Sequence, residues 1–291
     1  MFKSKVMLLT AVLIFGVLAI FVRNINLTSK EIALLRGGIG SLFLIAVMVF
    51  SKEKISVSAL KKNKFLLIAS GIGIGINWIF LFEAYKYTTV SIATLSYYCA
   101  PIFVTIAAPV VLKEKLSLKK FLCVCMAMLG MLFIVGTNKG TADAEYNHLL
   151  GIIYGLGAAV FYASVILMNK FIKGLKGVET TVAQLILASL LLLPYVVATS
   201  GFDFSNMTGK SWMYMIFLGV FNTGFAYALY FTAIKNLNSQ TIAVLSYIDP
   251  ITAVIISAVF LGEKMTIFQT VGGVLILAST FISENKIGSK K

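Results

Sequence analysis

Hydrophobic and polar positions divide the chain into long apolar runs that are separated by short breaks carrying lysine. The runs are continuously apolar instead of alternating every second residue, so they predict helices and not the strands of a membrane β-barrel. A helix of about 20 residues crosses a bilayer. On this measure the pattern predicts ten spans, at residues 6–22, 31–50, 65–84, 89–111, 117–136, 149–168, 179–198, 211–234, 240–261 and 266–283.

The first run follows Lys3 and Lys5, a beginning that is typical of a signal peptide. No small-residue cleavage site follows it, and only a short break separates it from the second run. We therefore expect the first run to be a retained helix.

The composition excludes several classes of protein. Of the 291 residues 59% are hydrophobic and 12% are charged, whereas soluble chains carry about 25% charged residues, so the chain is expected to be an integral membrane protein without a large soluble catalytic domain. The cysteines Cys99, Cys123 and Cys125 lie in apolar runs, and His148 is the only histidine. We expect no disulfide framework, no metal site and no cofactor.

The positive charges fix an orientation. Eighteen of the 25 lysines and arginines fall on one side of the ten spans, six fall on the other side, and Arg36 lies within a span. The positive-inside rule then predicts cytoplasmic N- and C-termini for a multi-pass protein of the plasma (inner) membrane. The net charge of +14 is explained by this orientation, so a nucleic-acid partner is not expected.

The chain repeats itself at an offset near 150 residues. The run SIATLSY at 91–97 returns as TIAVLSY at 241–247, and LKEKLS at 112–117 returns as LGEKMT at 261–266. The repeat predicts two halves, 1–137 and 148–285, each with five spans. Because five is an odd number, the second half would enter the membrane from the opposite side, and inverted repeats are typical of secondary transporters.

These residues resemble the drug/metabolite transporter superfamily, and within it the EamA-type permeases. The resemblance rests on LLR at 34–36, on the stretch from Tyr85 to Leu116 and on its second copy from Ala233 to Lys264. It implies a ten-helix secondary carrier with a central cavity lined by spans one, three, four, six, eight and nine, and it favours export. The family takes amino acids, purine-like metabolites, amines and drugs. Lys113 departs from the family, which more often has glycine there, as at Gly262.

Asp249 is the acidic residue that the pattern places deepest in the membrane. It lies about ten residues into the ninth span, and therefore about 15 Å deep. A charge at that depth costs roughly 2.5 to 3.5 kcal/mol, so it should face a cavity, a partner or a proton. Pro250 and its counterpart Pro101 each remove a helical hydrogen bond, which predicts two helices broken at mid-membrane. The alternative is that Asp249 is satisfied within the bundle and that each proline only kinks a helix.

Aromatic and amide side chains recur near this depth. Together with Asp249 we expect them to bind substrate: Asn77, Trp78, Tyr97, Tyr98, Tyr162, Asn222 and Tyr247. Aromatic faces beside a carboxylate suit an ammonium group, which suggests an amine or an amino acid. Ordinary helix packing is the alternative for each single ring.

Three further charged positions have two readings. Arg36 could bind a substrate carboxylate, or it could snorkel outward or pair with Glu31. Glu83 could serve in proton coupling or lie solvated at the outer rim. Glu114 and its counterpart Glu263 are expected to cap or clamp the turn after each broken helix, which is a structural role.

The sequence therefore predicts a transporter that moves a small polar metabolite, an amino acid or an amine, across the plasma membrane by alternating access. Proton coupling and uncoupled exchange both remain open, as does the number of protomers. A membrane-embedded enzyme and an ion channel are the rival classes. An enzyme would need a cluster of His, Asp or Glu within the membrane, and the pattern offers one central acid.

Overall fold

A computed structural model describes residues 2–22, 24–52, 56–88, 90–135, 147–199, 201, 203–252, 255 and 266–284. Regular structure in these residues is helical throughout. The helices are α1 (Phe2–Gly16), α2 (Leu18–Val22), α3 (Ser29–Phe50), α4 (Val57–Lys62), α5 (Lys64–Tyr87), α6 (Val90–Tyr97), α7 (Ala100–Val111), α8 (Leu118–Val135), α9 (His148–Phe171), α10 (Gly177–Thr199), α11 (Gly209–Phe217), the π-helix η1 (Leu218–Phe225), α12 (Ala226–Ile234), α13 (Ser239–Ser246) and α15 (Ile267–Glu284).

Five helical stretches in the described part of the chain are long and apolar enough to cross a membrane. They are Lys30–Phe50, Lys64–Ala84, His148–Phe171, Gly177–Thr199 and Gly209–Ile234. The expected spans at 6–22 and 89–111 are each divided into two helices, and part of the span at 240–261 lies outside the described residues. The all-helical membrane class is thus confirmed, while the count of ten spans stays a prediction.

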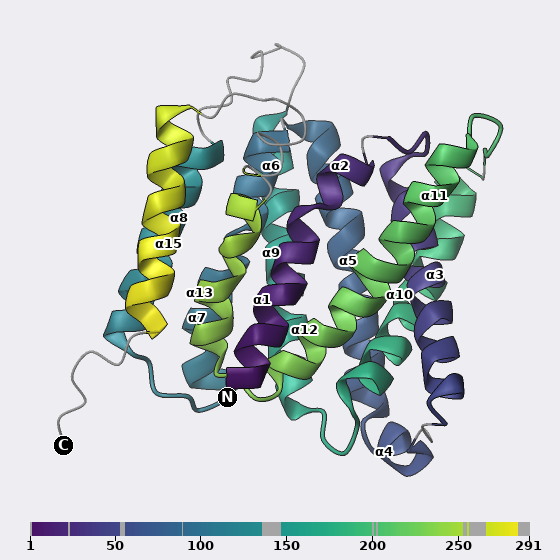
Figure 1. The fold of residues 1–291 in the computed structure, drawn as a ribbon, viewed down its shortest axis with the longest axis horizontal. Helices are drawn as coiled ribbons and strands as arrows, with labels where there is room; N and C mark the ends of the chain where they lie inside the picture. The colour runs from purple at the N-terminus through teal and green to yellow at the C-terminus, as the bar shows by residue number, and fades with distance from the viewer. Residues whose placement is uncertain are drawn as a thin grey trace.

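The helices pack side by side in a bundle (Figure 1). α8 packs against α15 at one end of the bundle, and α3 packs against α10 towards the other. Between these pairs, α1 packs on α12 and α5 packs on α9, while α7 contacts both α13 and α9. The broken helices α6, α7 and α13 therefore lie between the outer helix pairs, and the candidate site is found among them.

A glycine allows α9 to approach α6 closely. A Cβ atom at Gly155 would lie 2.7 Å from the Cβ of Ser96 and 3.2 Å from the carbonyl oxygen of Ala93, distances that real side chains avoid. Small residues permit such close approach between helices in lipid. This contact fixes α6 directly before the position where it ends.

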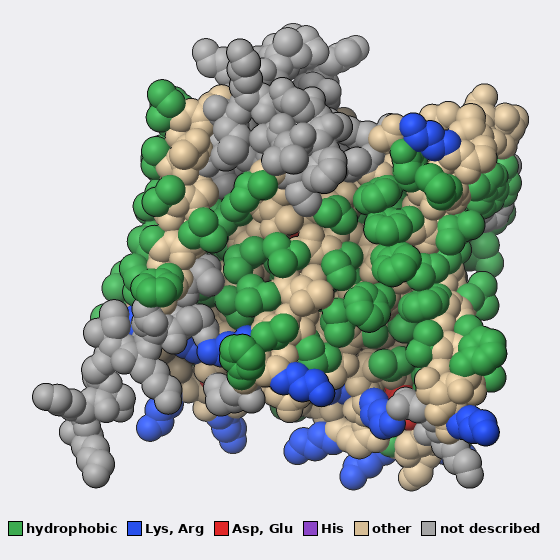
Figure 2. All heavy atoms as spheres, viewed as in Figure 1, with side chains coloured by type: hydrophobic (Ala, Val, Ile, Leu, Met, Phe, Trp, Pro, Cys, Tyr) green, Lys and Arg blue, Asp and Glu red, His purple; other side chains and the backbone are tan. Residues whose placement is uncertain are grey.

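The outer surface of the bundle is apolar. Large side chains such as Phe65, Val110 and Leu190 are mostly exposed. Figure 2 shows hydrophobic side chains over the middle of one face and basic side chains gathered along the edge at which the N-terminus lies. Exposed apolar area of this extent suits a lipid environment, because a soluble protein rarely exposes it.

At the same edge, the loop after α7 is bonded to the start of α13. The carboxylate of Glu114 accepts hydrogen bonds from the backbone N–H of Ser239, at 3.0 Å, and from its hydroxyl, at 3.2 Å. Gln240 donates to the carbonyl oxygen of Lys115 at 2.9 Å. A carboxylate at a helix N-terminus is favoured by the unpaired N–H groups and the helix dipole. These bonds hold the two broken helices together at this edge.

Lys113 adopts a left-handed backbone conformation, with a φ of 56°. It directly follows Leu112, the C-cap residue of α7. The position after a C-cap commonly takes this conformation and is most often glycine, because a Cβ atom there meets the backbone. The glycine that the family resemblance implies at this position therefore has a physical reason, and lysine carries strain.

We expect Lys113→Gly to raise the free energy of unfolding by up to about 1 kcal/mol. Glycine removes the strain of the left-handed backbone, and this gain exceeds the cost of the conformational entropy that glycine adds to the unfolded chain. Thermal unfolding of the purified protein measures the change. Lys115→Gly is the control, because Lys115 lies in the same loop without a positive φ. A Lys113 variant that is no more stable than the Lys115 variant would contradict this account.

Candidate functional site

Two helices are interrupted within the bundle. α6 ends at Tyr97 and α7 begins at Ala100, with Pro101 in its first turn. α13 ends at Ser246, and helical backbone resumes at residues 248–252, which include Pro250. A proline is tolerated in the first turn of a helix and breaks a helix interior. Each interruption thus lies two or three residues before the proline of its own segment.

The two interruptions are joined by hydrogen bonds between their aromatic and acidic side chains. The hydroxyl of Tyr98 donates to the Asp249 carboxylate at 2.7 Å. In return, the hydroxyl of Tyr247 donates to the carbonyl oxygen of Tyr98 at 3.0 Å, and the two tyrosine rings stack with centroids 6.4 Å apart. The carbonyl oxygen of Tyr98 and the carboxylate of Asp249 therefore each accept a hydrogen bond from the other interrupted segment.

Aromatic rings extend from this junction across the bundle. Tyr98 contacts Tyr97, which contacts Tyr162 of α9, with centroid distances of 5.8 and 5.7 Å. Tyr162 stacks on Tyr230 of α12 at 6.3 Å. Phe15 of α1 then links Tyr230 to Tyr227, at 5.9 and 5.3 Å. We call these six rings the aromatic series: Phe15, Tyr97, Tyr98, Tyr162, Tyr227 and Tyr230.

Arg36 lies at the far end of the aromatic series. Its guanidinium carbon is 4.7 Å from the ring centroid of Trp78, and its Nη2 donates to the hydroxyl of Tyr227 at 3.3 Å. Its Nε is buried without a hydrogen-bond partner. The expected alternative pairing with Glu31 is absent from the structure, because that carboxylate accepts bonds from Thr28 at the start of α3. In the part of the chain that the structure describes, no carboxylate pairs with Arg36.

The two predicted asparagines bind backbone in the structure. Asn77 is 3% exposed and donates from Nδ2 to the carbonyl oxygen of Ala158 at 2.7 Å, which ties α5 to α9. Asn222 is fully buried in the π-helix η1 and donates to the carbonyl oxygen of Ile14 at 2.7 Å, which ties η1 to α1. Both amide donors therefore hold helices together around the aromatic series.

The remaining predicted residues take other positions. Glu114 joins the turn after its own broken helix to the start of α13, as described above. Glu263 lies outside the described residues. Glu83 accepts a hydrogen bond from the Tyr195 hydroxyl at 2.6 Å and pairs with Lys86. The carboxylates of Glu114 and Glu83 thus serve as partners of a helix end and of neighbouring side chains.

Several members of the site were not singled out from the sequence. Tyr227, Tyr230 and Phe15 join the aromatic series, and Ser189 of α10 has a buried hydroxyl without a partner. Tyr227 and Tyr230 are three residues apart on α12 and so share one helix face, which is the signal that the sequence offered. Phe15 and Ser189 carry no comparable signal, since apolar and small residues fill every span.

Most polar residues of the site are partly accessible. Asp249, Tyr98, Tyr162 and Arg36 are all only partly buried, whereas Tyr247 is fully buried. No cluster of three potential metal ligands occurs among the described residues. The arrangement can bind a cation through a carboxylate and aromatic faces at one end, and an anion through a guanidinium at the other.

A helical bundle with several apolar helices long enough to span a membrane and an apolar outer surface is typical of a multi-pass integral membrane protein. The chain belongs to the EamA-like transporter family, whose profile matches residues 3–136 and 149–284.

Relatives and a solved structure agree with this assignment. "Uncharacterized transporter YxxF" of Bacillus subtilis is 29% identical over 94% of this chain and 87% of its own length. An "Uncharacterized transporter" of Archaeoglobus fulgidus is 29% identical over 97% of this chain and 96% of its own length. A solved crystal structure aligns with a TM-score of 0.85 at 16% identity over 97% of both chains, so it shares the fold.

We expect Asn77→Ala to lower the free energy of unfolding by about 1 to 3 kcal/mol, because it removes a buried bond between α5 and α9. The variant that remains folded should bind substrate with unchanged affinity. Thermal unfolding and ligand binding on one preparation separate the two effects. Ser164→Ala is the control, since its hydroxyl is exposed and bonds only to its own helix. A loss of affinity at unchanged stability would make Asn77 a substrate ligand.

Proposed function

We propose that the protein is a secondary carrier that moves an amine or an amino acid across the plasma membrane by alternating access. The observation that carries this proposal is the pairing of Asp249 with Tyr98 between two broken helices. Broken helices at the membrane midplane are a recurrent substrate site in secondary transporters. The transporter class sets the enzyme reading aside, and an ion channel is an outcome that the experiment below distinguishes.

The substrate class follows from the charges at the site. A positive ammonium group suits Asp249, because the carboxylate lies deep in the bundle with Tyr98 as its hydroxyl donor. The rings of Tyr97, Tyr98 and Tyr162 offer faces to a cation and to an apolar substrate body. A substrate carboxylate would bind Arg36, which has an unused Nε donor. An amine needs the first interaction alone. An amino acid can use both only if its ammonium group and its carboxylate lie at opposite ends of an extended body, because Arg36 is at the far end of the aromatic series from Asp249.

We further propose ten spans arranged as two inverted five-helix repeats, at residues 1–137 and 148–285. The helix contacts support this, because they map onto each other when the first five spans are exchanged with the last five. The contact of α1 with α12 corresponds to that of α9 with α5, and the contact of α3 with η1 corresponds to that of α10 with α5. The pairs α8 with α15, α3 with α10 and α7 with α13 map onto themselves.

The orientation in the proposal places both termini in the cytoplasm. It is supported by the basic side chains at the edge where the N-terminus lies (Figure 2). The bonds from Glu114 and Gln240 then close the site on the cytoplasmic side. Opening towards the cytoplasm has to break them. Export is favoured by the family resemblance, and Asp249 is the group that would carry a coupled proton.

Counterflow of labelled amines into proteoliposomes tests the proposal. We expect Asp249→Asn to lose at least about tenfold of the counterflow rate, because the variant removes the charge that binds the ammonium group. Tyr98→Phe should lose less, since it removes one hydrogen bond to that charge. Tyr154→Phe is the control, because its ring stacks on Tyr87 away from the aromatic series.

Undiminished counterflow in Asp249→Asn would remove this residue from the mechanism. Fluxes far above carrier turnover without counterflow would identify a channel instead. Proton coupling is measured in the same vesicles: if the carrier is coupled to protons, a pH gradient should drive more amine accumulation in vesicles with the parent protein than in vesicles without protein.

Arg36→Gln separates the two substrate classes. We expect it to abolish counterflow of amino acids while counterflow of the matching decarboxylated amines is retained. The reason is that, of the groups on the substrate, the guanidinium would bind only the carboxylate. Lys30→Gln is a matched control, since Lys30 is on the same helix and bonds to Thr199 at the surface. Equal losses for amines and amino acids would show that Arg36 supports the fold through Trp78 and Tyr227.

A further inference from the structure

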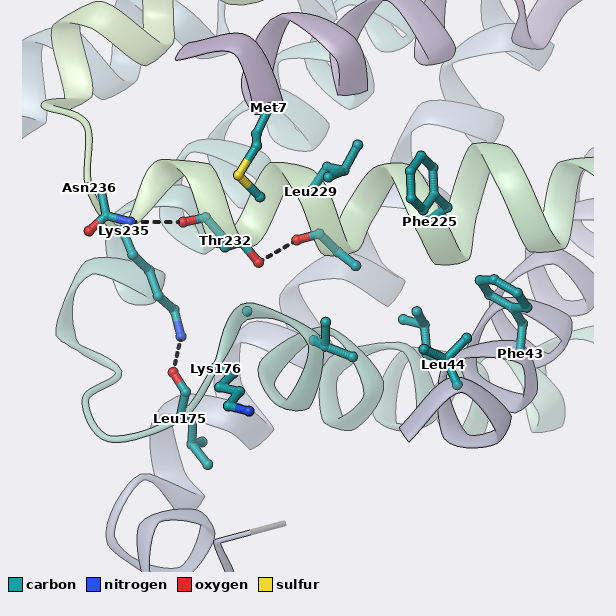
Figure 3. A pocket seen from close by; sticks show the side chains of 14 residues that line it. Met7, Phe43, Leu44, Leu175, Lys176, Phe225, Leu229, Thr232, Lys235 and Asn236 are labelled. Carbon is teal, nitrogen blue, oxygen red and sulfur yellow. Dashed lines mark hydrogen bonds between the residues drawn. The ribbon is translucent and has the colours of Figure 1, made fainter. Parts of the chain in front are cut away.

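A concave site whose lining does not include Asp249 opens on the side of the bundle. It is a groove of 570 Å³ between α1 and α3, with α12 and the start of α10 as its floor (Figure 3). Its walls include Met7, Phe43, Leu44 and Leu229. We call it the lateral groove. Its lining, all of it in the described part of the chain, includes no acidic side chain and no member of the aromatic series.

The lateral groove is open to the surroundings of the bundle. Val47 and Phe225 line it and are 38% and 42% exposed. In a protein that spans a membrane, an apolar groove on the outer surface faces acyl chains and not water. The lining therefore suits a hydrocarbon chain.

The length of the groove matches one leaflet. It follows α12 and its flanking residues from Phe225 to Asn236, which is eleven residue steps and therefore about 16 Å. The hydrocarbon core of a bilayer is about 30 Å thick, so one leaflet is about 15 Å. A groove of this length runs from the membrane surface to the midplane, as one acyl chain does.

Positive charge lies only at the surface end of the groove. Figure 3 shows Lys176 and Lys235 at one end, with Phe43 and Phe225 at the other. The Nζ of Lys235 donates to the carbonyl oxygen of Leu175 at 2.8 Å and to the Thr180 hydroxyl at 2.9 Å. An ammonium group has three donors, so one hydrogen remains for an anion.

The carboxylate of Glu179 acts on Lys235 through its charge. Glu179 accepts bonds from the backbone N–H groups of Ser56, at 3.1 Å, and Lys176, at 2.6 Å. Among the described residues it forms no ion pair with Lys235. Burial lowers the pKa of Lys235 to about 8, and the nearby Glu179 offsets this effect in part. An anion at the groove entrance would stabilise the charged form of Lys235.

We propose that the lateral groove binds an anionic phospholipid, with one acyl chain along α12 and the phosphate at Lys176 and Lys235. Shape supplies the chain site, and the lysines supply the preference for an anionic headgroup over a zwitterionic one. The site is independent of substrate binding, because none of its residues belongs to the aromatic series.

Lipid binding to the purified full-length protein tests the proposal. Native mass spectrometry compares phosphatidylglycerol with phosphatidylcholine of identical chains. We expect about a tenfold or greater preference for phosphatidylglycerol in the parent protein. The Lys176→Gln/Lys235→Gln variant should lose this preference, and Lys176→Arg/Lys235→Arg should retain it. The control Lys61→Gln/Lys62→Gln removes two lysines of α4 that are not in the groove and should behave as the parent.

The acyl chain is tested separately. Val47→Trp should fill the groove and reduce the binding of both lipids, whereas Val49→Trp, on the same helix, 69% exposed and outside the groove, should bind both as the parent does. Comparing the two lipids on each variant makes the result independent of a general loss of stability. A preference that survives Lys176→Gln/Lys235→Gln would overturn the proposal. Competition by free glycerol phosphate as effective as that of the lipid would also overturn it, because the site would then bind small anions.

Discussion

The hydrogen bond from Tyr98 to Asp249 joins two helices that are both interrupted in the middle of the bundle. In hydrocarbon, each unpaired backbone group and each charge costs several kcal/mol, so a broken helix persists only where other groups satisfy it. Here each segment satisfies the other, because the Tyr247 hydroxyl binds the carbonyl oxygen of Tyr98. The surrounding helices are arranged around this pairing: Gly155 lets α9 approach α6, and Asn77 ties α9 to α5.

The same constraint links the site to the edge of the bundle. The segment that carries Asp249 continues from α13, and the start of α13 is held by Glu114 and Gln240. A movement of α13 at that edge would therefore change the geometry at Asp249 and Tyr98. In the proposed cycle, substrate binding at the junction and the opening of the cytoplasmic edge are coupled through one short helix. Arg36 and Trp78 lie on α3 and α5, which are not part of this connection.

Much of this arrangement follows from the sequence. The depth of Asp249 and the two prolines predict broken helices. The free-energy cost of a charge in the membrane, or of a missing backbone N–H donor in a helix, depends only on where the residue lies along the span. The meeting of Tyr98 and Asp249 does not follow, since the two are 151 residues apart and their contact depends on how the halves pack. The π-helix at Leu218–Phe225 and the backbone contacts of Asn77 and Asn222 are likewise set by neighbouring helices. The left-handed Lys113 was visible only as a departure from glycine.

A double-mutant cycle on amine binding tests the central claim most directly, with Tyr98→Phe, Asp249→Asn and the combined variant. If Tyr98 acts on substrate through its bond to Asp249, the combined variant will bind as weakly as Asp249→Asn alone. Dissociation constants whose free-energy changes add would mean that the two residues act independently. That result would contradict a site built at the junction of the two broken helices.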